Sequence, residues 1–183
     1  MEFKETEAMK DIRKLARDFA EKKLLPTVKE RDENEIFDRE IFNQMGKLGL
    51  MGIPYAEKYN GCGLDFINFA IACEEISRID PSTGIGFEVH TSLCSWPINT
   101  YGTEEQKKKY LSKLTTGEWL GAFGLTEPNA GTDALNGATT AVKQGDEYVL
   151  NGTKIFNTNG GEAEVEIIFA TTDKTQKSKG MSA

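Results

Sequence analysis

The chain has 183 residues, 38% of them hydrophobic, which suffices for one ordinary domain or for one helical domain and part of a second. A net charge of −7 argues against nucleic-acid binding, because such proteins usually present a basic face, and mildly against anionic membranes. No apolar run approaches the roughly 20 residues that span a bilayer, and residues 1–10 lack the apolar core of a secretory signal. We therefore expect a cytoplasmic protein, or an organelle-matrix protein if a leader has been removed.

The sulfur and imidazole groups form no metal-ligand pattern in the sequence. Cys62, Cys73, Cys94 and the single His90 are widely separated, without the C-x-x-C or Cys/His spacing of zinc sites. We therefore expect no metal, and three reduced, partly buried thiols.

About two thirds of the chain has helical patterns, beginning near the N-terminus. Apolar residues recur at three- and four-residue steps from Met9 to Phe19, which predicts an amphipathic helix. Pro26 kinks this helix or opens its continuation. Asp38 is the predicted N-cap of a second helix over residues 38–48, which Gly49 follows.

The middle of the helical region is more apolar. Residues 61–63 form a predicted glycine-rich loop, and residues 66–79 are apolar on most faces, which predicts a buried helix. The Asp-Pro-Ser sequence at residues 80–82 then marks a break and a new helix start.

The last two helical segments meet near Gly102. Residues 85–101 are largely apolar and predict a helix that ends at this glycine. Thr103 and Gln106 have the spacing of a capping box, which predicts a charged helix reaching about residue 114.

The remaining residues change to a β pattern. Residues 139–141 and 148–150 alternate as in strands. The Asn-Gly pair at 151–152 predicts a type I′ hairpin that joins residues 148–150 to residues 153–156. Residues 165–171 predict a further strand, and residues 172–180 a polar, lysine-rich loop.

The predicted fold class is therefore α+β. An N-terminal all-α helical domain over residues 1–116 precedes a partial β-barrel or sheet domain over residues 117–183. Because a sheet of three or four strands is marginal by itself, we expect the β part to be the truncated start of a larger domain.

The segment GAFGLTEPNAGT at residues 121–132 has a composition suited to a ligand. Its small residues would let a flat ligand approach the backbone, and a predicted turn at 127–131 offers N–H groups to an anion, with Gly131 supplying positive φ. Thr126 and Thr132 add hydroxyls. The segment is neither a Walker A loop nor a Rossmann fingerprint. Composition alone leaves two interpretations, a cradle for a planar phosphorylated cofactor and a tight loop between domains.

Two strings resemble a known family. LTEPNAGTD at residues 125–133 resembles the first signature of acyl-CoA dehydrogenases, and NGTKIFNTNG at 151–160 resembles the second flavin segment of that family. The helical half is also similar, through ARDF at 16–19, EKYNG at 57–61 and YGTEEQK at 101–107. The likeness covers essentially the whole chain and is greatest to short-chain, butyryl-CoA-type bacterial enzymes, so the expected location is the bacterial cytoplasm.

This resemblance implies a function. The family removes two hydrogens from acyl-CoA thioesters, here short-chain ones, to give 2-enoyl-CoA, using FAD and passing electrons to an electron-transferring flavoprotein. Its members are homo-oligomers, here expected to be tetramers. The implied FAD-binding residues are Phe123, Leu125, Thr126, Thr132, Phe156 and Thr158. Among these, Thr132 would also stand near the thioester end of the substrate, Phe156 would cover one flavin face, and Thr158 would reach the N5 region.

The resemblance also implies that part of the machinery lies elsewhere. The glutamate base of the family belongs to a C-terminal four-helix bundle beyond residue 183, so we expect no catalytic residue here and an inactive chain when it is taken alone. Glu127 is interpreted as a turn residue, and Glu74 and Glu75 as helix-face charges, one of them partly buried.

Two positions depart from the family pattern. Asn136 stands where a small residue is usual, and Asn157 where an aliphatic residue is usual. The alternatives to a dehydrogenase are an acyl-CoA oxidase or enoyl-CoA reductase on the same fold, and a non-catalytic helical module used for protein association.

Overall fold

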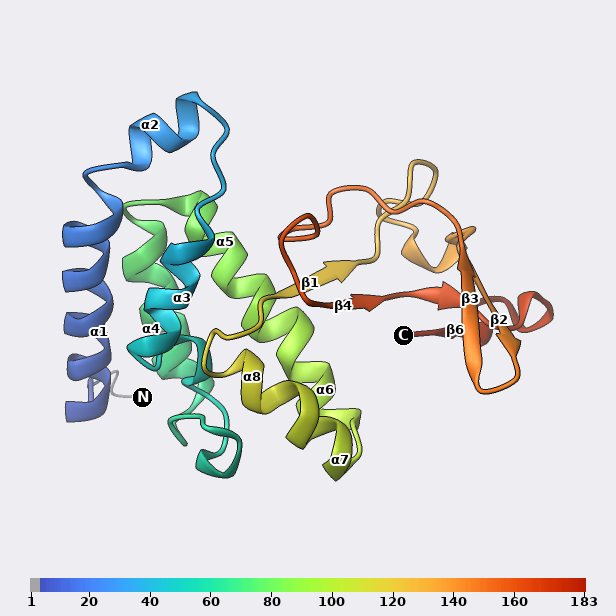
Figure 1. Ribbon diagram of the computed structural model, residues 1–183, viewed down its shortest axis with the longest axis horizontal. Helices are drawn as coiled ribbons and strands as arrows, with labels where there is room; N and C mark the ends of the chain where they lie inside the picture. The colour runs from blue at the N-terminus through green and yellow to red at the C-terminus, as the bar shows by residue number, and fades with distance from the viewer. Residues whose placement is uncertain (1–3) are drawn as a thin grey trace.

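The computed structural model of the protein describes residues 4–183, apart from the side chains of residues 177 and 178. Helices occupy the first part of the chain and strands the remainder (Figure 1), so the predicted α+β order is confirmed. No helix within the described residues is long and apolar enough to cross a membrane.

From residue 4 onward, the helical part is built from eight α-helical segments. They are α1 (Glu7–Phe19), α2 (Val28–Glu33), α3 (Arg39–Lys47), α4 (Phe66–Ser77), α5 (Pro81–Glu88), α6 (Trp96–Tyr101), α7 (Glu104–Gln106) and α8 (Ser112–Leu114). Three π-helical turns continue or connect these helices. Of these, η1 (Ala20–Leu24) continues α1, η4 (Val89–Ser95) links α5 to α6, and η5 (Lys107–Leu111) links α7 to α8. Shorter 3₁₀ turns are η2 (Leu50–Gly52) and η3 (Glu57–Tyr59).

Local capping explains where several helices begin. The carboxylate of Asp38 accepts from Glu40 N at the start of α3, and that of Asp80 accepts from Thr83 N at the start of α5. Thr103 forms the predicted capping box ahead of α7. These three predicted helix starts are confirmed.

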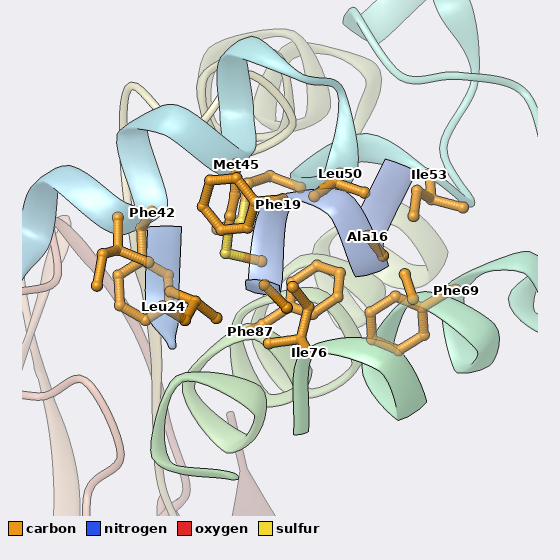
Figure 2. Packing of buried hydrophobic residues seen from close by; sticks show 14 of the residues in the cluster. Ala16, Phe19, Leu24, Phe42, Met45, Leu50, Ile53, Phe69, Ile76 and Phe87 are labelled. Carbon is orange, nitrogen blue, oxygen red and sulfur yellow. The ribbon is translucent and has the colours of Figure 1, made fainter. Parts of the chain in front are cut away.

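The helical core packs α1 against α3, α4 and α5. Figure 2 shows Phe19, Met45, Ile76 and Phe87 meeting in one buried cluster. Burial of each such side chain stabilises the fold by roughly 1.5–3 kcal/mol. These four residues come from four different helices, so the core fixes how the helices lie relative to one another.

A network of ion pairs links α1 to α4 beside this core. Arg13 and Arg17 pair with Glu75 at 2.7 and 2.8 Å, and the Glu75 side chain is only 3% exposed. Burial raises its pKa less than the two arginines lower it, to about 2. The expectation of one partly buried glutamate is therefore confirmed for Glu75, while Glu74 is exposed.

The β part contains two small sheets. In the first, β1 (Gly121–Gly124) pairs in parallel with β4 (Val165–Ile168). The second has the order β3-β2-β5-β6 and comprises β2 (Thr140–Gln144), β3 (Glu147–Asn151), β5 (Ala170–Thr171) and β6 (Met181–Ser182). The predicted strand over 165–171 therefore exists but is divided at Phe169, where the chain passes from one sheet to the other.

The predicted hairpin at Asn151-Gly152 is wrong. The two-residue turn lies at Gly145-Asp146, where Gly145 has a φ of +63°. Asn151 instead ends β3, paired with Thr140. A Cβ on Gly152 would lie 2.2 Å from Thr139 Oγ1, so this glycine permits a close backbone approach and does not form a turn.

The predicted loop over residues 172–180 is also partly wrong. Most of it is the 3₁₀ segment η7 (Lys174–Gly180), whose start is capped by Asp173 accepting from Thr175 N at 2.9 Å. A further 3₁₀ turn, η6 (Ala134–Asn136), precedes β2.

Candidate functional site

The site begins at Gly121, the first residue of β1, where the chain passes from the helical part to the β part (Figure 1). His90 Nδ1 accepts from Gly121 N at 2.9 Å, and Asn159 Nδ2 donates to Gly121 O at 3.0 Å. A Cβ on residue 121 would lie 2.7 Å from Cys94 Sγ. A glycine is therefore required for β1 to approach η4 this closely.

Backbone and side-chain hydrogen bonds hold the two motif segments side by side. Ile155 N donates to Thr126 O at 2.9 Å, and Lys154 Nζ donates to Leu125 O at 3.0 Å. These contacts bridge 29 residues of sequence. The structure thus brings residues 123–126 together with residues 154–158.

The aromatic residues of these segments differ in exposure. Phe156 is 86% exposed and has a φ of +59°, an unusual backbone region for a bulky residue. Phe123 is half-buried and packs edge-on against Phe169, with ring centroids 5.6 Å apart. The Phe156 ring is therefore free to stack on a planar ligand.

Several polar groups of the site have no partner within residues 4–183. The backbone N–H groups of Leu125 and Thr126 donate no hydrogen bond there, and neither do the hydroxyls of Thr126 and Thr158. All three residues are half-buried. Thr132 is exposed, and no hydrogen bond in this part of the chain joins it to the other predicted site residues.

Glu127 is a structural carboxylate. Its side chain is buried, pairs with Lys154 Nζ at 2.7 Å, and accepts from Ala138 N and Thr139 N. Burial raises its pKa, but these hydrogen bonds outweigh burial and bring the pKa down to about 2. Glu127 therefore stays charged near neutral pH, which supports its interpretation as a turn residue.

The predicted turn is present, but Gly131 has no special conformation. The backbones of Glu127 and Ala130 exchange two hydrogen bonds of 3.1 Å. The turn therefore closes before Gly131, which does not adopt positive φ. That part of the prediction is wrong because no left-handed residue is needed there.

The Asn157 departure is matched by a second polar residue. Asn157 Nδ2 donates to Glu166 Oε1 at 2.8 Å, and a Cβ on Gly124 would lie 2.8 Å from the same oxygen. Burial raises the pKa of Glu166 and the Asn157 hydrogen bond lowers it in part. Gly124, Asn157 and Glu166 thus pack together on one face of β1. Asn136, the other departure, is exposed and bonds only to Asp133.

Sequence patterns missed several residues that organise the site: His90, Lys154, Asn159 and Glu166. In the sequence, the only pattern that would mark His90 is that of a metal ligand, which it does not fit. Its imidazole is fully buried, and burial lowers its pKa to about 3. Its place inside the apolar run at residues 85–101 was the available signal, since a buried polar group needs partners.

The sequence matches two domains of one family. The acyl-CoA dehydrogenase N-terminal domain matches residues 6–118, and the acyl-CoA dehydrogenase middle domain matches residues 122–183. The chain belongs to the acyl-CoA dehydrogenase family. It is 50% identical over 183 residues to a short-chain specific acyl-CoA dehydrogenase of Clostridium acetobutylicum, covering 100% of this chain and 48% of that protein.

Several solved structures are similar over nearly the whole chain. Butyryl-CoA dehydrogenase from Megasphaera elsdenii superposes with a TM-score of 0.95 at 48% identity, covering 99% of this chain and 48% of that one. A chain in a structure described as the electron transferring flavoprotein of Acidaminococcus fermentans gives 0.97 at 51% identity, covering 100% and 48%. An FAD complex of PigA gives 0.86 at 31% identity, covering 94% and 46%.

These matches cover nearly all of this chain but only part of each matched protein. The chain spans about half the length of the acyl-CoA dehydrogenases that it matches. The expected α+β fold, with a helical domain followed by the start of the middle sheet domain, is confirmed for this half.

Proposed function

We propose that the whole protein to which these residues belong is an FAD-dependent acyl-CoA dehydrogenase acting on short-chain acyl-CoA thioesters. The observation that carries the proposal is the pairing of residues 123–126 with 154–158, which leaves the Phe156 ring 86% exposed beside free N–H and hydroxyl groups. The relatives named above, a short-chain specific dehydrogenase and a butyryl-CoA dehydrogenase, support the substrate class.

The groups at this site fit the chemistry of FAD. An exposed aromatic ring stacks on a planar ring system and excludes water from it, and Phe156 offers such a ring. Free N–H groups at Leu125 and Thr126 suit the carbonyl edge of a flavin. We assign flavin contacts to Phe123, Leu125, Thr126, Phe156 and Thr158, and pyrophosphate and substrate contacts to Thr132.

FAD, when bound, supplies the hydride acceptor of the reaction. The residues of this chain would orient the ring: Phe156 would cover one face, and Thr158 would offer its hydroxyl near N5. A hydroxyl at that position tunes hydride acceptance. The site thereby contributes binding, orientation and exclusion of water, and no proton abstraction.

Two buried carboxylates of this half are unsuited to act as the base. Glu75 and Glu127 have pKa values of about 2, far below the value near neutrality that favours a general base. Glu166 accepts from Asn157 Nδ2 at 2.8 Å and lies close to Gly124, and we interpret it as a packing partner of these two residues. We assign proton abstraction to a carboxylate outside these 183 residues.

The remaining assignments follow from the same proposal. The division between domains falls at residues 116 and 117. An electron-transferring flavoprotein accepts the electrons, the whole protein is a homotetramer, and it works in the bacterial cytoplasm.

Anaerobic titration of the purified whole protein with butyryl-CoA tests the reaction. We expect a yellow protein whose visible flavin absorbance is bleached by butyryl-CoA, with 2-enoyl-CoA as product. Fast reoxidation by oxygen would instead indicate an oxidase. A whole protein that takes up no FAD would favour the non-catalytic association module.

A further inference from the structure

His90 occupies the point where three segments meet. It lies in the π-helical turn η4 and is fully buried. One ring nitrogen, Nε2, lies 3.2 Å from Leu114 O at the end of α8, and the other, Nδ1, lies 2.9 Å from Gly121 N at the start of β1. A single imidazole thus bridges the end of the helical part and the first residue of β1.

The two partners define the tautomer of the ring. A carbonyl oxygen can only accept, so Nε2 must carry the proton that it donates to Leu114 O. A backbone N–H can only donate, so Nδ1 must be unprotonated to accept from Gly121. Protonation of Nδ1 would remove that acceptor and place two N–H groups face to face.

The charged surroundings favour the neutral ring as well. The guanidinium of Arg39, from α3, disfavours a second positive charge on the imidazole and lowers its pKa further. Glu164, which precedes β4, pairs with Arg39 at 3.1 Å and accepts from Leu120 N at 2.7 Å. The thiol of Cys94, from η4, faces β1 and is held neutral because burial raises its pKa. Among the described residues, no carboxylate contacts the imidazole to stabilise a cation.

Gly121 is held on both of its backbone polar groups. Its N–H is bound by His90, and its C=O is bound by Asn159 Nδ2, which also donates to Gly86 O of α5 at 2.9 Å. Asn159 directly follows Thr158. The hydrogen bonds at Gly121 therefore fix both proposed flavin segments against the helical part.

We propose that His90 is a positioning residue for the flavin site, which as a neutral imidazole protonated on Nε2 fixes the first residue of β1. Its effect on flavin affinity rests on the proposed function, whereas the tautomer and the Gly121 hydrogen bond do not. Phe123 and Leu125 lie two and four residues after Gly121. A shift of Gly121 would therefore also shift these two assigned flavin contacts.

A matched pair of substitutions separates the two hydrogen bonds. In His90→Asn the amide oxygen sits at the position of Nδ1, which retains an acceptor for Gly121 and loses the Leu114 contact. In His90→Gln the longer amide reaches the position of Nε2, which retains the Leu114 contact and loses the Gly121 acceptor. His90→Asn leaves the larger gap, so any loss of packing opposes the order of effects that the hydrogen bonds predict.

The readouts are hydrogen–deuterium exchange at the Gly121 amide and FAD affinity of the whole protein. We expect His90→Gln to raise Gly121 exchange and weaken FAD binding by about tenfold, the factor for one lost hydrogen bond of roughly 1.4 kcal/mol. His90→Asn should stay within about threefold of wild type in both. Equal effects of the two variants, or a larger effect of His90→Asn, would overturn the proposal.

The tautomer is measured directly in the wild-type protein. In the whole protein labelled with ¹⁵N-histidine, the signals that disappear in His90→Gln identify His90. We expect one protonated Nε2 and one unprotonated Nδ1, with no titration between pH 8 and pH 5; the opposite tautomer or a titrating ring would contradict the proposal. If the wild type binds no FAD but the difference in Gly121 exchange persists, the proposed function fails and the positioning of β1 stands.

Discussion

Because His90 is buried and neutral, we expect the free energy of unfolding of this chain to fall in mild acid. Its ordinary pKa of 6.5 falls to about 3 in the folded protein, mainly through burial. Below pH 6.5 the unfolded chain therefore binds a proton that the folded chain does not bind. The stability contributed by the neutral ring is complete above pH 6.5 and is lost as the pH falls toward 3.

The size of the loss follows from linkage. Each pH unit between these two pKa values costs about 1.4 kcal/mol. Lowering the pH from about 7 to about 5 spans roughly 1.5 units of that interval, so the free energy of unfolding should fall by about 2 kcal/mol. Glu75 and Glu127 contribute little in this range because their pKa values change from 4.5 to about 2 on folding.

Urea unfolding followed by far-UV circular dichroism at the two pH values measures this loss. The control is His90→Asn, which has no group that titrates in the range and should lose most of the pH dependence. Equal stability of the wild type at both pH values, or the same fall in His90→Asn, would refute the assignment of a neutral buried imidazole.

Three further substitutions test other parts of the site. Glu127→Gln leaves a buried lysine without its counter-charge and should lower the free energy of unfolding by about 3 kcal/mol in urea titrations at neutral pH. Phe156→Ala should weaken FAD binding about tenfold and change stability by less than about 0.5 kcal/mol, whereas Tyr148→Ala, another exposed aromatic, should leave FAD affinity unchanged. Gly124→Ala should cost about 1–3 kcal/mol by overpacking against Glu166, and Glu166→Ala in the same chain should restore most of it; no rescue would contradict that contact.

Helix starts were predictable from the sequence because capping is local. Asp38, Asp80 and Thr103 each bond a backbone N–H two or three residues away. The hairpin was misplaced because Asn-Gly is a strong local turn signal, and a local signal takes no account of which strands pair. What excludes the Asn-Gly pair is a contact across strands, the close approach of Gly152 to Thr139.

The candidate site, like the fold, could be predicted only in part from the sequence. The motif strings identified both segments, but their pairing rests on Ile155 N and Thr126 O, which are far apart in sequence. His90 and Asn159 escaped prediction because a lone polar residue has no periodicity, and its partners are backbone groups of other elements. The polar residue at position 157 is explained by its hydrogen bond to Glu166, which the sequence does not reveal.

The central claim is that residues 123–126 and 154–158 form one flavin site. Hydrogen–deuterium exchange of the whole protein with and without FAD tests it most directly. We predict that FAD protects both segments together and leaves the exposed strand β3 unchanged. Protection of only one segment, or of neither, would contradict the claim.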